Sequence, residues 1–227
     1  MMMKTSTFLT LGVALLALTG CSEKEDPAAG LSAPQKMAMG KSPTKEGGKP
    51  LAIGDAWVSE DVKMKGVDGK MHTISGEAGR KGTLVIFTCN HCPYAQAWEE
   101  RVAEIGNDVA KKGLGVIAIN PNDPKAYPED GFSEMKKRSE KLGLSFPYVV
   151  DDTSDVARAF GASKTPEAYL FDAEHELVYH GAIDDSADAP DKVEDHYLID
   201  ATDALLEGDE LERTETKAVG CSIKFRS

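Results

Sequence analysis

The stretch TLVIFTCNHCPYAQAWEERVAEIGNDVAKK, residues 83–112, decides the fold of this chain. Its first part, Thr83 to Thr88, is a continuous apolar and β-branched run, which predicts a strand buried on both faces of a sheet. From about Pro93 to Lys112, apolar residues recur three or four apart, as on one face of a helix. Residues 114–120, LGVIAIN, predict a second buried strand. The three segments therefore indicate a right-handed βαβ unit.

Further elements are expected on both sides of this unit. Upstream, residues 62–65 and 71–74 flank a Gly-Val-Asp-Gly sequence, which predicts a β-hairpin. Downstream we expect helices over 132–142, 156–160 and 193–206, and strands over 146–150, 168–171 and 177–180. Alternating strands and helices predict the α/β class, with a central mixed sheet flanked by helices and preceded by the hairpin.

Residues 1–20 have the pattern of a bacterial export signal. They carry one positive charge, Lys4, and a short apolar run, Phe8 to Leu18, too short to span a bilayer. The block LTGC, ending at Cys21, resembles the lipobox of bacterial lipoproteins, in which the cysteine is acylated. A plain signal peptide with a chance cysteine is the alternative. Ser22 in place of Asp resembles the enterobacterial signal for the outer membrane, so we expect an anchor at Cys21 in the cell envelope, facing the periplasm.

Residues 21–50 lack a hydrophobic period and are rich in Ala, Gly, Pro, Lys, Glu and Ser, which predicts a flexible tether. Residues 51–227 then form one globular domain with a C-terminal tail. The net charge of -12 excludes nucleic acid as an expected partner, because an acidic surface repels phosphates. The membrane partner is reached through the lipid, since no basic surface is present to hold anionic headgroups.

The cysteines are the residues that bear chemistry. With Cys21 assigned to the lipid, Cys89, Cys92 and Cys221 remain. Cys89 and Cys92 form C-N-H-C directly after the buried strand and at the start of the helix. Free N–H groups and the positive end of the helix dipole stabilise a thiolate there, which makes a better nucleophile and leaving group near neutral pH. Two cysteines three apart at this position can close a small, reversible disulfide.

Other interpretations of these residues stay open at this point. The C-N-H-C pair could be a static disulfide or half of a zinc site, which would need two further ligands such as Cys221 and a histidine. An imidazolium at His91 beside a thiolate would make the disulfide more oxidising, although His91 could merely fill a loop position. Cys221 either returns to the pair as a second resolving thiol or is a free or structural cysteine.

Several blocks resemble a known family. FTCNHCPYA, residues 87–95, resembles the active-site turn of thioredoxin-fold proteins, and TPEAYLFD, residues 165–172, resembles the segment that carries their cis-proline. Residues 51–224 as a whole are similar to the peroxiredoxin-like, redoxin-type (AhpC/TSA) branch of the thioredoxin-like superfamily. The blocks that match this branch are AYPEDG at 126–131, YHGAIDD at 179–185 and the terminal GCSIK. The resemblance implies a thioredoxin-like fold.

The resemblance also implies a role for each matching residue. Cys89 would be the exposed attacking thiol, and Cys92, buried one turn in, would resolve the mixed disulfide. Pro166 would be cis and pack against the pair, and Thr165 would offer its backbone to an extended substrate strand. A trans proline at the start of a strand is the alternative. Neither a cofactor nor a metal is expected.

Three departures from the family pattern bear on these roles. The strand at 83–88 has no buried Asp, so no proton acceptor for Cys92 can be named. Lys164 stands where members of the branch often have a cysteine, which leaves a cation near the pair. Thr88 directly precedes Cys89, whereas peroxiredoxins place a threonine three residues ahead of the peroxidatic cysteine. The last departure weakens a peroxidase interpretation.

The sequence therefore predicts a thiol–disulfide oxidoreductase of the cell envelope that acts through Cys89 and Cys92 on exported protein thiols or disulfides. The first alternative is a thiol peroxidase of the peroxiredoxin type. The second is a non-enzymatic, copper-binding module, because soft thiolates suit Cu(I). Thioredoxin-fold copper chaperones use a C-x-x-x-C-P turn, and the turn here is one residue shorter.

Overall fold

The structure, a computed structural model, describes residues 49–227. The expected export signal, Cys21 and nearly all of the tether lie outside the described residues, so these remain predictions. Within the described range, no helix combines the length and the apolar character that a membrane span requires.

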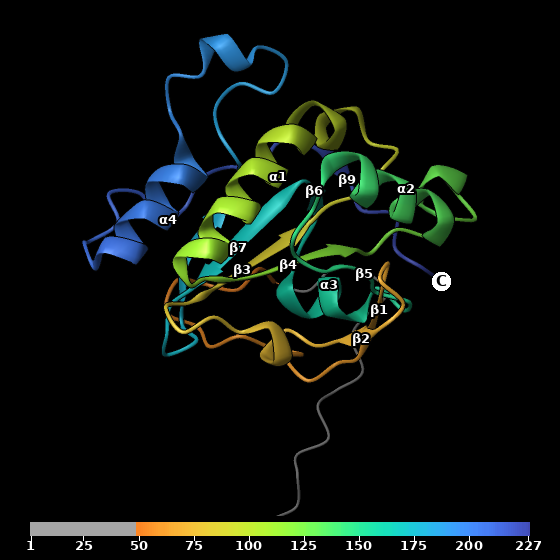
Figure 1. Cartoon of the computed structure of the whole chain (residues 1–227), viewed down its shortest axis with the longest axis horizontal. Coiled ribbons are helices and arrows are strands. Elements are labelled where there is room, and N and C mark those ends of the chain that lie inside the picture. Colours follow the sequence, from red (N-terminus) through yellow and green to blue (C-terminus); the bar gives the residue numbers. More distant parts are fainter. Residues whose placement is uncertain (1–48) are drawn as a thin grey trace, which may run out of the picture. The chain divides into compact units, whose positions relative to one another are not determined.

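A mixed sheet of seven strands forms the centre of the described chain, in the order β2-β1-β5-β4-β3-β7-β8 (Figure 1). β3 (Thr83–Phe87) and β4 (Gly115–Asn120) are parallel, and β5 (Tyr148–Val150) is parallel to β4. β7 (Glu167–Phe171) is antiparallel to β3, and β8 (Leu177–Gly181) is antiparallel to β7. The predicted mixed sheet and its strand pairs are confirmed.

The predicted hairpin extends this sheet. β1 (Met64–Gly66) and β2 (Met71–His72) pair antiparallel, and β1 also pairs with β5. The ring of His72 hydrogen-bonds Asp68 at 3.0 Å and Glu77 at 2.7 Å, which ties the hairpin to the following turn. Burial by itself lowers the pKa of His72, but the hydrogen bonds to these two carboxylates outweigh it and raise the pKa above 6.5.

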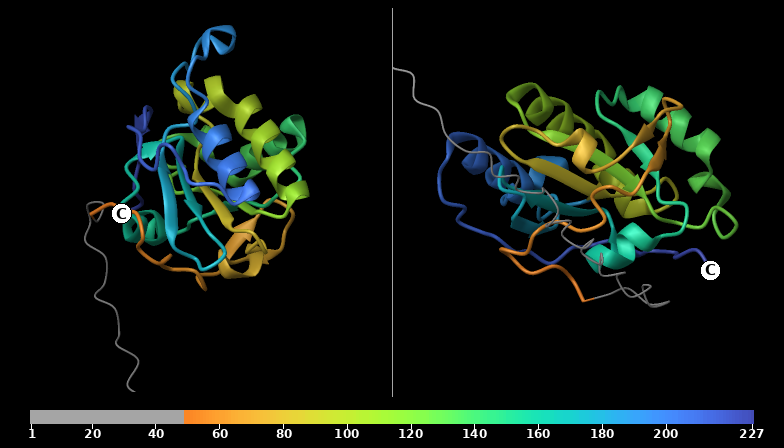
Figure 2. Two further views of the ribbon diagram at one scale, coloured as in Figure 1. Left: turned by 90° about the vertical axis from the view of Figure 1, so that its left-hand side faces the viewer. Right: turned by 90° about the horizontal axis from the view of Figure 1, so that it is seen from below.

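Helices cover both faces of the sheet (Figures 1 and 2). α1 (Pro93–Lys112), α2 (Phe132–Leu142) and α4 (Tyr197–Glu207) pack on one face, and α3 (Asp155–Phe160) packs on the other. α1 and α2 begin and end at the predicted residues. Short 3-10 helices lie at Ser75–Glu77, Pro128–Asp130 and Pro190–Lys192.

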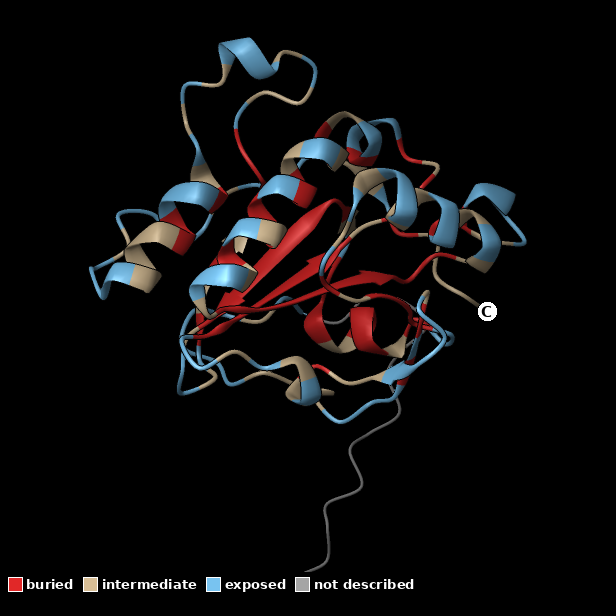
Figure 3. Ribbon diagram, in the orientation of Figure 1, coloured by how far each residue is buried: buried red, intermediate tan, exposed pale blue. Residues whose placement is uncertain are grey.

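The central strand β3 contributes to an apolar core on each face. Leu84 and Ile86 pack with Trp98 of α1, whereas Val85 and Phe87 pack with residues of α3. Successive side chains of a strand point to opposite faces, so a continuous apolar run fills both cores. Figure 3 shows the central strands buried along their length, as the sequence predicted.

Several predicted boundaries differ from the structure by one to four residues, including those of the hairpin strands, and two differences have a clear physical reason. The last helix begins at Tyr197, not at residue 193, because residues 193–196 are not helical and Leu198 N–H donates to Ile183 O at 3.0 Å. The strand predicted from Phe146 begins at Tyr148. Pro147 precedes it without an N–H to donate, and its carbonyl accepts the Ala118 N–H at 2.9 Å.

A second, two-stranded sheet was not predicted. β6 (Lys164–Thr165) pairs antiparallel with β9 (Cys221–Ser222), with Thr165 opposite Cys221. The C-terminal tail therefore folds back onto the segment that precedes Pro166. This places the third cysteine of the described residues at the same end of the sheet as the first two.

Candidate active site

Cys89 and Cys92 lie where β3 ends and α1 begins. Cys89 comes two residues after β3, and Cys92 is the N-cap residue of α1, with Pro93 in the first turn. Both thiols are free, and both residues are buried, with 6 % of Cys89 and 0 % of Cys92 exposed. The expectation of an exposed Cys89 is wrong: the Thr165 hydroxyl lies 3.1 Å from its Sγ and helps to cover it.

The two thiols share protons as a pair. A hydrogen bond with Cys89 lowers the pKa of Cys92 to about 4, and N–H groups of Ala95 and Cys221 that face its sulfur act in the same direction. The same bond, together with burial and the charge of Asp130, raises the pKa of Cys89 above its ordinary range. The opposite directions of these two pKa shifts favour a reduced pair that shares one proton, with the negative charge favoured on the sulfur at the helix N-terminus.

The segment around Pro166 lies directly against this pair. The Thr165–Pro166 peptide bond is cis, as the family resemblance predicts. The Cys92 Sγ lies 3.2 Å from Thr165 O. Glu167, which is buried, accepts the N–H groups of Ser163 and Lys164, both at 2.8 Å, and so fixes the backbone that approaches the thiols.

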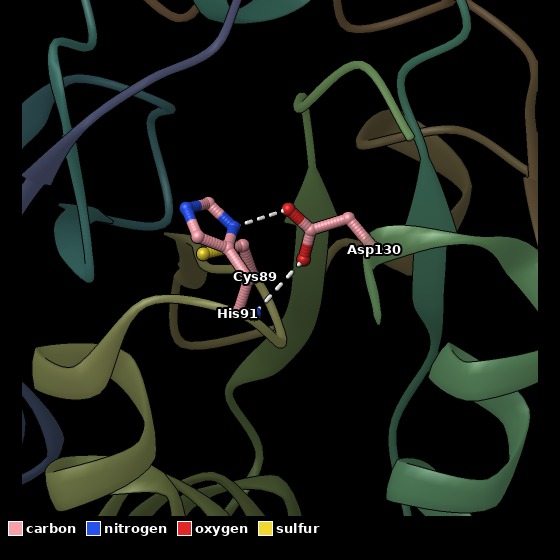
Figure 4. A group of neighbouring side chains, drawn as sticks. All are labelled: Cys89, His91 and Asp130. Atoms are coloured by element: carbon pink, nitrogen blue, oxygen red, sulfur yellow. Dashed lines mark hydrogen bonds and ion pairs between the residues drawn. The ribbon is translucent and has the colours of Figure 1, made fainter. Parts of the chain in front are cut away.

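Asp130 is the site residue that the sequence analysis missed (Figure 4). Its buried carboxylate hydrogen-bonds the N–H of Asn90 at 2.7 Å, the N–H of His91 at 3.2 Å, the His91 ring at 2.5 Å and the Asn122 amide at 2.9 Å. It thereby holds the turn between the two cysteines. The available signal was the block AYPEDG, which matches the family and follows the carboxyl end of β4, where α/β proteins place functional loops.

His91 is held in place on two sides. Its ring stacks on Tyr127, with centroids 3.8 Å apart, and pairs with Asp130. The structure therefore gives His91 specific partners, and the redox role proposed for it remains a prediction.

A group of potential metal ligands also includes His91. One donor atom from each of Cys89, His91 and Asp130 lies within 4.8 Å of the others. This separation suits a single ion, although His91 and Asp130 already satisfy each other.

Cys221 joins the pair from β9. Its N–H donates to Cys92 Sγ at 3.4 Å, and it is only partly buried. Burial, and then a hydrogen bond to Cys92 and the charge of that thiol, raise the pKa of Cys221 to about 11, against the opposing effect of Lys224 and Lys164. Lys164, expected near the pair, extends its ammonium toward Ser222 Oγ at 3.5 Å and so acts on the tail thiol.

A pocket opens beside Cys89 on the side away from the tail. It is lined by both apolar and polar side chains, including Arg138, Val102, Phe146 and Tyr148. The Tyr148 hydroxyl donates to Asn90 Oδ1 at 3.1 Å, and burial raises its pKa well above 10. Arg138, which lines this pocket, forms an ion pair with Glu99, which lines it as well.

These features define a thioredoxin-like protein: a C-x-x-C turn at the start of a helix, a cis-proline segment against it, and a mixed sheet between helices. The AhpC/TSA family model matches residues 55–180, which is more than half of the sequence. The chain belongs to the AhpC/TSA family.

Solved structures agree with this assignment. An uncharacterised conserved protein from Geobacillus kaustophilus is 36% identical, with a TM-score of 0.71, over 77% of this chain and 93% of that one. A hypothetical protein from Sinorhizobium meliloti 1021 is 33% identical, with a TM-score of 0.72, over 81% of this chain and 100% of that one. These relatives show the fold and the family.

A curated relative has a named activity. The thiol-disulfide oxidoreductase ResA of Geobacillus thermodenitrificans is 25% identical over 122 residues, which are 54% of this chain. The match spans 64% of the length of that relative.

Proposed function

We propose that this protein is a thiol–disulfide oxidoreductase of the cell envelope that works through a Cys89–Cys92 redox pair. The observation that carries the proposal is the placement of two free thiols, packed against each other, at the start of α1 and against the cis-Pro166 segment. The similarity to a protein named thiol-disulfide oxidoreductase supports it.

The geometry suggests how the pair exchanges with a partner disulfide. Cys89 is the more accessible of the two, so a partner reaches it first. As Cys89 attacks, its proton passes to the Cys92 thiolate and one partner sulfur leaves as a thiolate. Cys92 then attacks the Cys89 sulfur of the mixed disulfide. The second partner sulfur leaves, and the partner takes up the proton of Cys92. The Cys92 thiolate thus accepts the proton of Cys89, and a partner thiolate is the acceptor for the proton of Cys92. Exchange is reversible, so the direction follows the potential of the partner.

Reduction of a model disulfide substrate tests this activity. Insulin reduction with dithiothreitol should be accelerated by the protein and lost in Cys89→Ser. Cys21→Ser serves as the matched control, because it removes a cysteine outside the described domain. A Cys89→Ser variant with the full rate would contradict the proposal.

The location in the envelope and the action on exported protein thiols rest on residues 1–50. A signal-like run and a lipobox-like LTGC before a tether support export and acylation of Cys21, with sorting to the outer membrane. Incorporation of labelled palmitate in bacteria should be lost in Cys21→Ser. Equal labelling of both proteins, or no labelling of either, would contradict the anchor.

A thiol peroxidase is a second candidate. The Thr165 hydroxyl lies 3.1 Å from the Cys89 sulfur, and the pocket beside Cys89 is also lined by Arg138, so a hydroxyl and a cation line the space that a peroxide would enter. Peroxide consumption with a thiol donor, dependent on Cys89 and faster than insulin reduction, would favour this candidate.

Copper binding is a third candidate, supported by the two close thiols and by the Cys89–His91–Asp130 group. Stoichiometric Cu(I) binding by the reduced protein, lost in Cys92→Ser, would favour it, provided that insulin reduction is absent.

A further inference from the structure

Strand β9 occupies the backbone edge that thioredoxin-like proteins are expected to offer to a substrate. Thr165 pairs with Cys221 and Lys164 pairs with Ser222, and Thr165 is fully buried. The expectation that Thr165 is free to receive an extended substrate strand is therefore corrected, because the chain's own tail takes that place. Within this strand, the residue opposite Thr165 is a cysteine.

The tail is anchored in this position on both sides of Cys221. After it, Ile223 N–H donates to Ser163 O at 3.0 Å and Lys224 N–H to Asn122 Oδ1 at 2.7 Å, and Ile223 is 6 % exposed. Before it, Gly220 lies so close to the substrate edge that a Cβ would be 2.2 Å from Thr165 O. A glycine at 220 thus permits a contact that any larger residue would prevent.

The accessibility of the three thiols in the described domain increases from the pair to the tail. Cys92 is fully buried, Cys89 is 6 % exposed and Cys221 is partly exposed. Cys92 packs with both of the other cysteines and accepts the Cys221 N–H at 3.4 Å. Cys92 is therefore the central sulfur of the group, and Cys221 is the one that faces solvent most.

We propose that Cys221 is a third redox-active thiol and that β9 is a built-in substrate strand, so that a disulfide at Cys92 moves between Cys89 and Cys221. This inference rests on the proposed oxidoreductase function and adds an internal partner to the same site. Exchange with outside thiols then passes through Cys221 as well as through Cys89.

The internal step balances without an external reagent. In the oxidised protein, the Cys221 sulfur attacks the Cys92 sulfur of the Cys89–Cys92 disulfide. The Cys92–Cys221 bond forms, the Cys89–Cys92 bond breaks, and the proton of Cys221 goes to Cys89, which leaves as a thiol. Oxidation of Cys92 also removes two causes that raise the pKa of Cys221, the hydrogen bond and the charge of the Cys92 thiolate. Cys221 is thus more readily ionised when its attack is needed.

Disulfide mapping tests the proposal directly. Full-length protein carrying Cys21→Ser is oxidised with glutathione disulfide, digested and analysed by mass spectrometry. With Cys89→Ser added, the main product should be an intramolecular Cys92–Cys221 disulfide. With Cys221→Ser added, it should be Cys89–Cys92. If Cys89→Ser yields only glutathione adducts or dimers while Cys221→Ser closes its disulfide, the proposal is wrong.

A second variant separates the position of the tail from the chemistry of the thiol. Gly220→Val in the Cys89→Ser background should displace β9 and lower the yield of Cys92–Cys221 by about tenfold. In the protein that keeps Cys89, Gly220→Val should still form Cys89–Cys92, which also shows that the domain folds. An undiminished yield of Cys92–Cys221 in Gly220→Val would overturn the role of the strand.

These outcomes are distinguishable from those of the insulin assay. Insulin reduction without any Cys92–Cys221 bond would leave the oxidoreductase proposal intact and reject this inference. A Cys92–Cys221 bond in a protein that does not reduce insulin would reject the oxidoreductase proposal instead.

Discussion

Replacing the buried carboxylate of Asp130 should destabilise the reduced protein strongly. The side chain is 0 % exposed, and its two oxygens hydrogen-bond the main-chain N–H groups of Asn90 and His91, the His91 ring and the Asn122 amide. Three of these four donors belong to residues 90 and 91, which lie between the cysteines. Asp130→Ala removes the acceptor for all of them.

The magnitude follows from the number and burial of these donors. Each buried donor left without a partner costs about 1–3 kcal/mol, and hydrogen bonds to a charged group contribute about 1.5–3 kcal/mol each. The donors are neighbours, so their penalties do not simply add. We expect a loss of about 4 kcal/mol for Asp130→Ala and about 2 kcal/mol for Asp130→Asn, whose amide oxygen keeps one acceptor.

Urea unfolding of the reduced protein, followed by far-ultraviolet circular dichroism, measures this loss. For an m-value of about 2 kcal/mol/M, the midpoint of Asp130→Ala should fall by about 2 M. Glu129→Ala is the matched control, because Glu129 is the neighbouring carboxylate and is exposed. Equal midpoints for Asp130→Ala and Glu129→Ala would refute the view that this carboxylate holds the turn.

Other predictions concern ionisation and packing. As the pH is raised, the ultraviolet thiolate absorbance of the reduced protein should increase near pH 4, the lowered pKa of Cys92. A single increase near pH 9 in the wild type would contradict this prediction, and so would an increase near pH 4 that persists in Cys92→Ser. The carboxylates of Asp68 and Glu77 raise the pKa of His72, so protonated His72 stabilises the folded state at pH values well below 6.5. This contribution to the free energy of unfolding is lost as the pH rises through the raised pKa. His72→Gln should therefore reduce the melting temperature more in acid than in alkali, and an equal reduction would count against that assignment. Gly106→Val should cost about 1–3 kcal/mol of unfolding free energy by overpacking, because a Cβ at Gly106 lies 2.4 Å from the Phe146 ring. Gly106→Val combined with Phe146→Leu should recover part of that loss, whereas additive losses would contradict the contact.

Much of the fold was predictable because its signals are local. The apolar run of β3 and the apolar period of α1 each report how a short segment is buried, and both elements formed as predicted. The start of α4 was predicted wrongly, because the acidic residues before Tyr197 resemble a first helical turn in composition. A contact between Leu198 and Ile183 sets the actual start, and no local pattern contains it.

The sequence by itself placed Cys89 and Cys92 at the start of a helix, because a strand, a turn and a helix follow one another along a short stretch of chain. It did not place Asp130 under the turn, nor Cys221 beside Cys92. Those contacts join residues 40 to 129 positions apart. Only the tertiary structure decided them, because the order of strands in the sheet and the return of the tail determine which distant segments meet.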